Sequence, residues 1–190
     1  MNIFDFLYKK IINWSRMPNA DRYLFALSFS ESSFFPIPPD VMLIPMCLAN
    51  RSKIWYLAGI TTISSVLGGI LGYLLGYLVF DIIETWLINS HYWPPYKTAR
   101  LWFDEWGLFA VLLAGFSPIP YKIFTVAAGI TGVNIFGFIL FSILGRGVRF
   151  FLIATLIYMG GDAFKHIIEK YINILGWFIV FIVLVFFLLL

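Results

Sequence analysis

The sequence has little charge. Only 12% of its 190 residues are Asp, Glu, Lys or Arg, whereas 61% are hydrophobic. Soluble domains carry about a quarter charged and about half apolar residues, because they need a polar surface. This composition excludes an ordinary soluble domain and predicts an all-α integral membrane protein. The length suits a single domain of about four to six membrane-embedded segments.

The sequence also lacks the residue clusters that several functions need. Cys47 is the single cysteine, so no intrachain disulfide can form and no cysteine-based metal site is expected. The two histidines, His91 and His166, stand far apart and are interpreted as ordinary polar residues. The Lys and Arg residues form no dense tract, which argues against a nucleic-acid partner. We therefore predict no metal, no cofactor and no catalytic residues.

Long uncharged runs predict the membrane spans. Residues 54–80 contain no acidic or basic side chain, which is enough for a tilted helix across about 30 Å of hydrocarbon. Residues 133–160 form a second run, interrupted only by Arg146 and Arg149, and residues 171–190 form a third. These runs predict three transmembrane helices.

The N-terminal residues 1–16 have a different pattern. Apolar side chains recur at helical spacing, and Lys9 and Lys10 lie off that stripe, which predicts an amphipathic helix in the headgroup region. Charges this early also argue against a cleavable signal peptide. The stripe consists of Phe4, Leu7, Ile11 and Trp14.

Two further apolar stretches, 24–50 and 108–132, are interrupted by prolines. Proline lacks the backbone N–H and disfavours a helical conformation of the preceding residue, so neither stretch can be one straight helix. Irregular backbone at membrane depth persists only where it is buried in protein or lines a wet cavity. Both stretches are therefore predicted to be re-entrant hairpins. Their tips carry Pro36, Pro38 and Pro39 in the first and Pro118 and Pro120 in the second.

The two hairpins are related by sequence. A shift of 82 residues lays Pro36-Ile37-Pro38 on Pro118-Ile119-Pro120 and Asp40 on Lys122. Each hairpin is followed by a long span, so the chain is predicted to contain two copies of a hairpin plus a helix. Paired broken segments in matching halves indicate a transporter's binding site. The predicted division is 1–23 (interfacial helix), 24–83 (repeat one), 84–105 (external connection), 106–162 (repeat two) and 171–190 (final transmembrane helix).

The placement of basic residues predicts that the repeats are inverted. If each hairpin returns to its own side, eight basic residues share one compartment, whereas residues 81–105 carry only Lys97 and Arg100 beside four acids. The positive-inside rule places the eight, and the N-terminus, in the cytoplasm. The hairpins then enter from opposite faces, and their tips meet near the midplane. The eight are Lys9, Lys10, Arg16, Arg22, Arg51, Lys53, Lys165 and Lys170.

Five charges remain in membrane-embedded sequence: Glu31, Asp40, Lys122, Arg146 and Arg149. A central Asp, Lys or Arg costs about 2.5–3.5 kcal/mol on insertion scales, so ion pairing or a polar cavity is expected. Asp40 and Lys122 occupy equivalent positions on the two tips and are predicted to be partners. Three cations against two acids favour an anionic group such as a phosphate, and a remaining carboxylate could accept a proton. The alternative is that all five form structural ion pairs.

A ribbon of small residues lies within the first span. Four residues at intervals of four place small side chains on one face, where another helix can approach closely. Packing within the chain is the favoured interpretation, and a homo-oligomer contact is the alternative. The ribbon consists of Ser64, Gly68, Gly72 and Gly76.

Both tip sequences resemble the DedA family, also described as SNARE-associated or VTT-domain proteins. Glu31 followed by Pro36-Ile37-Pro38-Pro39-Asp40 is similar to the family's first tip, where an acid precedes prolines. Phe116, Pro118 and Lys122 are similar to its Phe-x-Pro-x-x-Arg second tip. The order of elements is similar over nearly the whole chain. Two departures, Gly115 where many members have arginine and Lys122 for the later arginine, resemble the YqaA-type branch.

The resemblance implies an integral protein of the bacterial inner membrane that moves lipids between leaflets. The implied cargo includes a polyprenyl phosphate carrier, driven by the proton gradient. Our hypothesis is a transporter or scramblase, not an enzyme, in which Lys122, Arg146 and Arg149 bind an anionic lipid headgroup. Glu31 and Asp40 would carry protons or gate. The alternatives are a lipid-modifying membrane enzyme and a non-catalytic membrane scaffold.

The topology can be tested by cysteine labelling in a Cys47-free background. Single cysteines at 51–53 and 165–170 should react with an impermeant thiol reagent from the cytoplasm only, because their basic neighbours stay inside. Cysteines at 90–100 should react from the opposite side only. Labelling of residue 52 from outside would make the first hairpin a complete span and would remove the inverted repeat.

Overall fold

A computed structural model describes residues 17, 19–34, 38–90, 93–117 and 121–160. All regular secondary structure in these ranges is helical. The predicted helices at 1–16 and 171–190 lie outside the described residues. The elements are α2 (Ala20–Ser33), α3 (Asp40–Ala49), a 3-10 turn η1 (Arg51–Lys53), α4 (Ile54–Ile88), α5 (Trp93–Phe116), α6 (Tyr121–Thr131) and a helix at Ile135–Gly160.

Two of these helices are long and apolar enough to cross a membrane, namely the stretches Arg51–Phe80 and Ile135–Gly160. They coincide with two of the three predicted spans. The first helix, however, does not end with the uncharged run, because α4 continues to Ile88. Charged residues end a hydrocarbon-compatible run without ending a helix, and Asp81 and Glu84 are accommodated in the last turns. The predicted connection 84–105 is therefore largely helical.

Both proline-containing stretches are broken helices, as predicted. In the first, α2 ends at Ser33 and α3 begins at Asp40, with Pro39 as its N-cap. In the second, α5 ends at Phe116 and α6 begins at Tyr121. The direction in which each pair enters a membrane stays a prediction.

A left-handed glycine ends α6. Gly132 has φ +72°, and the Val133 amide donates to the Ala128 carbonyl oxygen at 3.1 Å. This geometry is a Schellman cap, in which a glycine takes a conformation that side chains disfavour. The cap redirects the chain into the Ile135–Gly160 helix.

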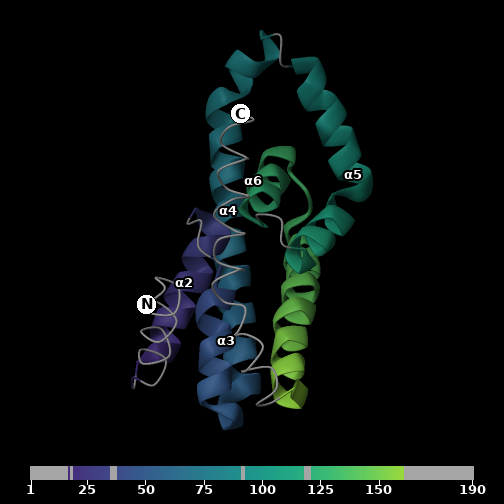
Figure 1. Ribbon diagram of the computed structural model, residues 1–190. Coiled ribbons are helices and arrows are strands. Elements are labelled where there is room, and N and C mark those ends of the chain that lie inside the picture. Colours follow the sequence, from purple (N-terminus) through teal and green to yellow (C-terminus); the bar gives the residue numbers. More distant parts are fainter. Residues whose placement is uncertain (1–16, 18, 35–37, 91–92, 118–120, 161–190) are drawn as a thin grey trace, which may run out of the picture.

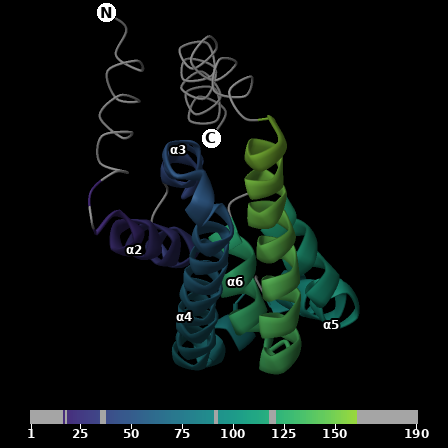
Figure 2. The ribbon, with the colours of Figure 1, turned by 90° about the horizontal axis from the view of Figure 1, so that it is seen from below.

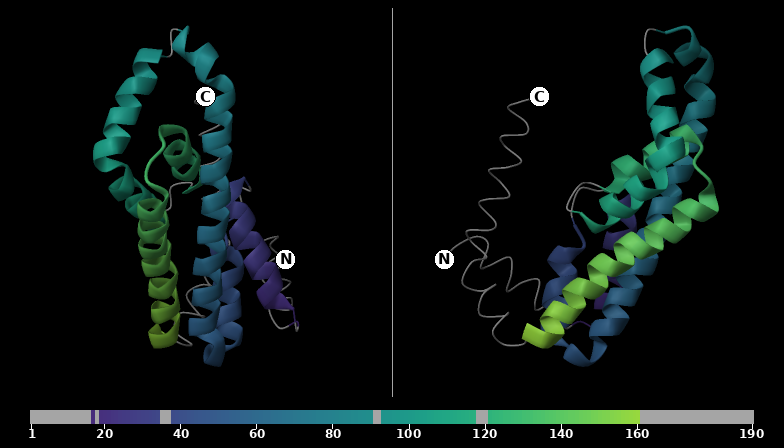
Figure 3. Two further views of the ribbon diagram at one scale, coloured as in Figure 1. Left: turned by 180° about the vertical axis from the view of Figure 1, so that it is seen from behind. Right: turned by 90° about the vertical axis from the view of Figure 1, so that its right-hand side faces the viewer.

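Helix α4 is the central element (Figure 1). It packs against both α2 and α6, and α6 lies between α4 and α5, which together form an arch. The Ile135–Gly160 helix, yellow-green, runs past α4 on the side opposite α2 (Figures 2 and 3). The two hairpins thus share α4 as a common support.

The small-residue ribbon explains how closely these helices approach α4. A Cβ on Gly68 would lie 2.1 Å from the Phe29 carbonyl oxygen of α2, and one on Gly76 would lie 2.2 Å from the Val126 carbonyl oxygen of α6. All four ribbon residues are buried within one copy of the chain. The ribbon therefore serves internal packing, and an oligomer formed through it would have to displace α2 and α6.

Two alanine substitutions on α4 should have opposite effects on stability. Gly76→Ala should destabilise by about 1–3 kcal/mol, because its Cβ overlaps backbone of α6. Gly59→Ala is the matched control: nothing lies within 4 Å of its Cβ, so it should be neutral or stabilise by up to about 1 kcal/mol. Thermal unfolding in detergent measures both changes. Equal stability of the two variants would contradict the close approach of α6.

Candidate functional site

The five embedded charges lie on four elements. Glu31 is near the end of α2, Asp40 opens α3, and Lys122 is the second residue of α6. Arg146 and Arg149 lie on the Ile135–Gly160 helix. The structure brings Glu31 to Arg146 and Asp40 to Arg149, so both acids are paired with cations from the second span.

Arg146 is enclosed on every side. Its side chain is only 2% exposed, and its Nη2 donates to Glu31 Oε2 at 2.7 Å. Its Nε donates to the Ser65 hydroxyl of α4. The rings of Tyr121 and Phe150 lie 5.0 and 4.7 Å from the guanidinium carbon, a distance typical of cation–π contacts. The charge is compensated by protein groups alone.

Hydroxyl groups close this arrangement into a ring. The Ser32 hydroxyl donates to Glu31 Oε2 at 3.1 Å and lies 2.7 Å from the Ser65 hydroxyl. Because Ser32 gives its proton to Glu31, Ser65 donates to Ser32 and accepts from Arg146. We call this cycle of Arg146, Ser65, Ser32 and Glu31 the arginine ring. Each of the four side chains makes two of its bonds within the ring.

The second ion pair is more open. Arg149 Nη2 pairs with Asp40 Oδ2, and its Nη1 donates to the Ser117 carbonyl oxygen at 2.6 Å. Both side chains of the pair are 18% exposed. Asp40 Oδ1 is buried and accepts no hydrogen bond from the described residues. Arg149 therefore joins the start of α3 to the end of α5, and its carboxylate partner is incompletely satisfied.

Lys122 does not pair with Asp40, so that prediction is wrong. Its Nζ lies 3.4 Å from the Phe34 carbonyl oxygen, at the end of α2. Asp40 instead forms an ion pair with Arg149, whose longer forked side chain reaches it from the second span. Lys122 nevertheless contacts the first hairpin, at the end of α2. The predicted meeting of the proline tips stays a prediction, because 35–37 and 118–120 lie outside the described residues. Equivalent positions in the repeat predicted the wrong pair.

The arginine ring lies between two apolar clusters. Along α4, the first cluster includes Leu57 and Ala58, the ring contributes Ser65, and the second cluster includes Tyr73. Along the Ile135–Gly160 helix the order is reversed, because this helix begins at the other end of the fold. Its Phe138 belongs to the second cluster, and Phe150, Ala154 and Ile157 belong to the first. The charges thus form one polar layer across an apolar interior.

Sequence reasoning missed the uncharged members of this layer, Ser32, Ser65, Tyr121 and Ser142. Tyr121 is fully buried and donates to the Ser142 hydroxyl while covering Arg146. One signal was present, since hydroxyl side chains cluster at 61–65 within an otherwise apolar run. Serines are common in packed membrane helices, however, and their spacing alone does not identify a charge partner.

Gly115 has a packing role. A Cβ at this position would lie 3.2 Å from the Arg146 amide nitrogen and 3.2 Å from the Gly145 carbonyl carbon. The end of α5 therefore packs closely against the second span, beside the first of its two arginines. This contact leaves no room for a long side chain at 115, and it holds Ser117 where its carbonyl meets Arg149.

A pair of double-mutant cycles tests the observed partners. Asp40→Asn combined with Arg149→Gln should show a coupling of about 0.5–3 kcal/mol in unfolding free energy, since each change alone leaves a buried charge unpaired. Asp40→Asn combined with Lys122→Gln is the control, and its effects should add. Equilibrium unfolding in mixed micelles supplies the energies. Coupling in the Lys122 cycle alone would reverse our assignment.

Comparison with known proteins identifies the family of the chain. A VTT domain profile matches residues 37–159, a range that contains Asp40, Lys122 and both arginines. An uncharacterised protein of Haemophilus influenzae is 40% identical over 180 residues, covering 95% of this chain and 94% of that protein. One from Histophilus somni is 41% identical over 190 residues and the full length of both. Inner membrane protein YqaA of Escherichia coli is 26% identical over 138 residues, 70% of this chain and 87% of YqaA.

No solved structure matches the chain. The profile, however, runs from the first proline tip to the end of the second span, which is more than half of the sequence. It includes Pro38, Pro39 and Asp40 of the first tip and the whole second tip, whereas Glu31 and Pro36 precede it. The chain is a membrane protein that belongs to the VTT-domain, or DedA, family.

Proposed function

We propose that the chain is a transporter or scramblase of the bacterial inner membrane that moves a phosphorylated lipid between leaflets. The location rests on similarity to YqaA, whose name describes an inner membrane protein. The lipid rests on one observation: the two broken hairpins adjoin at Arg149, a partly exposed guanidinium whose partner Asp40 has one carboxylate oxygen without a hydrogen bond from the described part of the chain. Lys122 provides a second cation on the neighbouring tip.

The two arginines have different roles in this proposal. Arg146 has no free face for a ligand, because Glu31, Ser65, Tyr121 and Phe150 surround it. It acts as a structural joint or gate between the repeats and not as a primary headgroup ligand. Arg149 and Lys122 bind the phosphate. A guanidinium can hold two phosphate oxygens at once, which an ammonium cannot.

Helix ends add to the positive potential at this place. Helices α3 and α6 both begin at the tips, so the partially positive ends of their dipoles lie beside Asp40 and Lys122. In transporters with broken helices, such half-helix N-termini face anionic substrate groups. The tips therefore favour a phosphate even before the side chains are counted.

The acids supply proton coupling. A phosphate that binds Arg149 displaces Asp40, and the released carboxylate has lost its cation in a low-dielectric layer. Taking up a proton removes that cost. Glu31 would do the same if the arginine ring opens. Lipid binding and proton uptake are linked in this scheme because the phosphate and Asp40 compete for Arg149.

A membrane scaffold is the second candidate. The arginine ring is satisfied without any ligand, as a purely structural lock would be. A lipid-modifying enzyme is distinguished by its products, so the lipids are analysed for chemical change at the end of the transport measurement.

Conservative substitutions separate these candidates. Arg149→Lys should lower transport of labelled phosphatidic acid in proteoliposomes by about tenfold per folded molecule, because a bidentate, charge-assisted contact is lost. Arg146→Lys is the matched variant: it should reduce the yield of folded protein, since one ammonium would replace the two separate nitrogens with which Arg146 reaches Ser65 and Glu31. Transport is normalised to monodisperse protein. Normal transport by a folded Arg149→Ala variant would sink the headgroup role, and absence of transport by the parent protein would favour the scaffold.

A further inference from the structure

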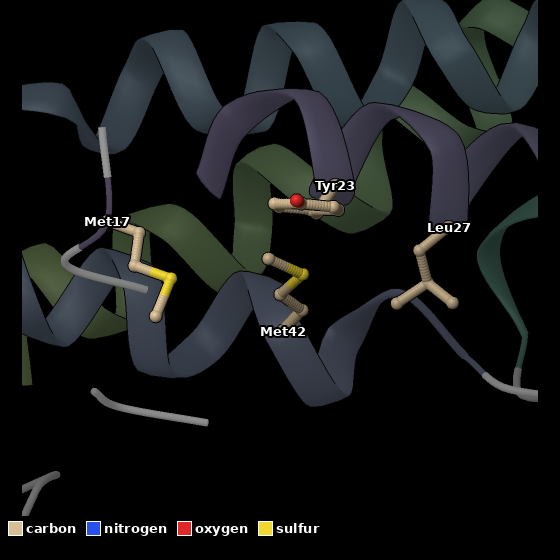
Figure 4. Close-up of a pocket in the computed structure, with 4 residues that line it drawn as sticks. All are labelled: Met17, Tyr23, Leu27 and Met42. Carbon is tan, nitrogen blue, oxygen red and sulfur yellow. The ribbon is translucent and has the colours of Figure 1, made fainter. Parts of the chain in front are cut away.

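An apolar groove lies between the two arms of the first hairpin. Its volume is about 450 Å³, which is within the range of small-ligand sites. Among the described residues it is lined by Met17, Tyr23, Leu27 and Met42. Figure 4 shows Tyr23 and Leu27 extending from α2 toward Met42 on α3. The site described above does not include this groove.

The groove is continuous with the acidic side of the tips. Leu27 lies one helical turn before Glu31 on the same face of α2, and the end of this helix is contacted by Lys122, whose Nζ lies 3.4 Å from the Phe34 carbonyl oxygen. At its other end, Met17 and Tyr23 are 50% and 64% exposed, so the groove opens away from the protein. It therefore leads from the outside of the hairpin toward the polar layer.

The walls of the groove suit a flexible hydrocarbon chain. No charged side chain is among its four described lining residues, and two of them are methionines, which adapt to irregular apolar shapes. A chain that enters the groove from the bilayer leaves hydrocarbon and not water, so the groove favours it through van der Waals contacts and not through the hydrophobic effect. A phosphate without a hydrocarbon chain would make no such contacts with these side chains.

We propose that the groove holds the hydrocarbon chain of the lipid whose phosphate binds at Arg149 and Lys122. The inference rests on the proposed function and specifies its substrate as an amphiphile recognised at both ends. Bulk lipid would also wet an apolar surface, but only a bound substrate would couple occupancy of the groove to the headgroup site. That coupling is the property to measure.

The experiment uses the full-length protein in phosphatidylcholine nanodiscs. The probes are phosphatidic acid and diacylglycerol, each with a photoactivatable diazirine on one acyl chain, and labelled peptides are identified by mass spectrometry. Phosphatidic acid should label the segment containing Tyr23, Leu27 and Met42 at least about tenfold more than diacylglycerol, the effect expected from a charge-assisted phosphate contact. Arg149→Ala should abolish that preference.

Filling the groove should weaken the label. Leu27→Trp and Met42→Trp, made separately and checked for monodispersity, should each reduce phosphatidic acid labelling to the level of diacylglycerol, because the indole occupies the space of the acyl chain. Ile63→Trp, on an exposed face of α4, is the matched control and should leave labelling unchanged. Short-chain dihexanoyl phosphatidic acid should protect Arg149 from guanidine-directed modification equally in all three variants.

Four results would overturn the proposal. Equal labelling by both probes would mean that bulk lipid fills the groove. An efficient disulfide between cysteines at 11 and 27, in the Cys47-free background, would assign the groove to the N-terminal segment. Loss of transport in Arg149→Ala without any labelling preference in the parent protein would refute the groove while supporting the headgroup site. Conversely, a labelling preference that Arg149→Ala leaves intact would refute both the coupling and the headgroup role.

Discussion

The bond between Arg146 and Glu31 is the constraint on which the rest of this structure depends. A guanidinium in an apolar interior is costly, and removing either member of such a pair leaves an uncompensated charge. Glu31 belongs to the first hairpin and Arg146 to the second span, so this bond fixes the first hairpin against the second span. Ser65 and Tyr121 then have defined places, because each must satisfy or cover the same guanidinium.

Close helix packing is what brings these partners within reach. Gly68 lets α2 lie against α4, and this approach puts Ser32 beside Ser65. Gly115 does the same for the end of α5 against the second span, which places Ser117 beside Arg149. The polar contacts thus depend on the small residues. The glycines remove the side-chain bulk that would otherwise keep each polar group from its partner.

Much of this architecture could be predicted from the sequence, and the physical reasons are specific. Proline and hydropathy are local signals, so the breaks near 34–39 and 117–120 and two long apolar helices were predicted correctly. The helical extension of α4 to Ile88 was missed, because loss of hydrophobicity does not require loss of helix. The pairing of Asp40 with Arg149 was missed as well, since it depends on the rotation of side chains about their helices. The membrane orientation of the hairpins stays a prediction, because it depends on a bilayer and not on contacts within the chain.

The closed form of the arginine ring has a consequence for leakage. Any protein that carries a lipid through a membrane must keep ions and water from following. A row of water molecules across this layer needs polar groups that still have free hydrogen-bond donors or acceptors. The ring offers few such groups, because its members bond to one another. Opening it partway leaves several buried groups unsatisfied at once, so intermediate apertures are disfavoured. In the transport cycle proposed above, the ring would therefore make this layer an electrical insulator that is either sealed or fully open, and a complete opening would admit a headgroup without a partly open state through which ions could pass.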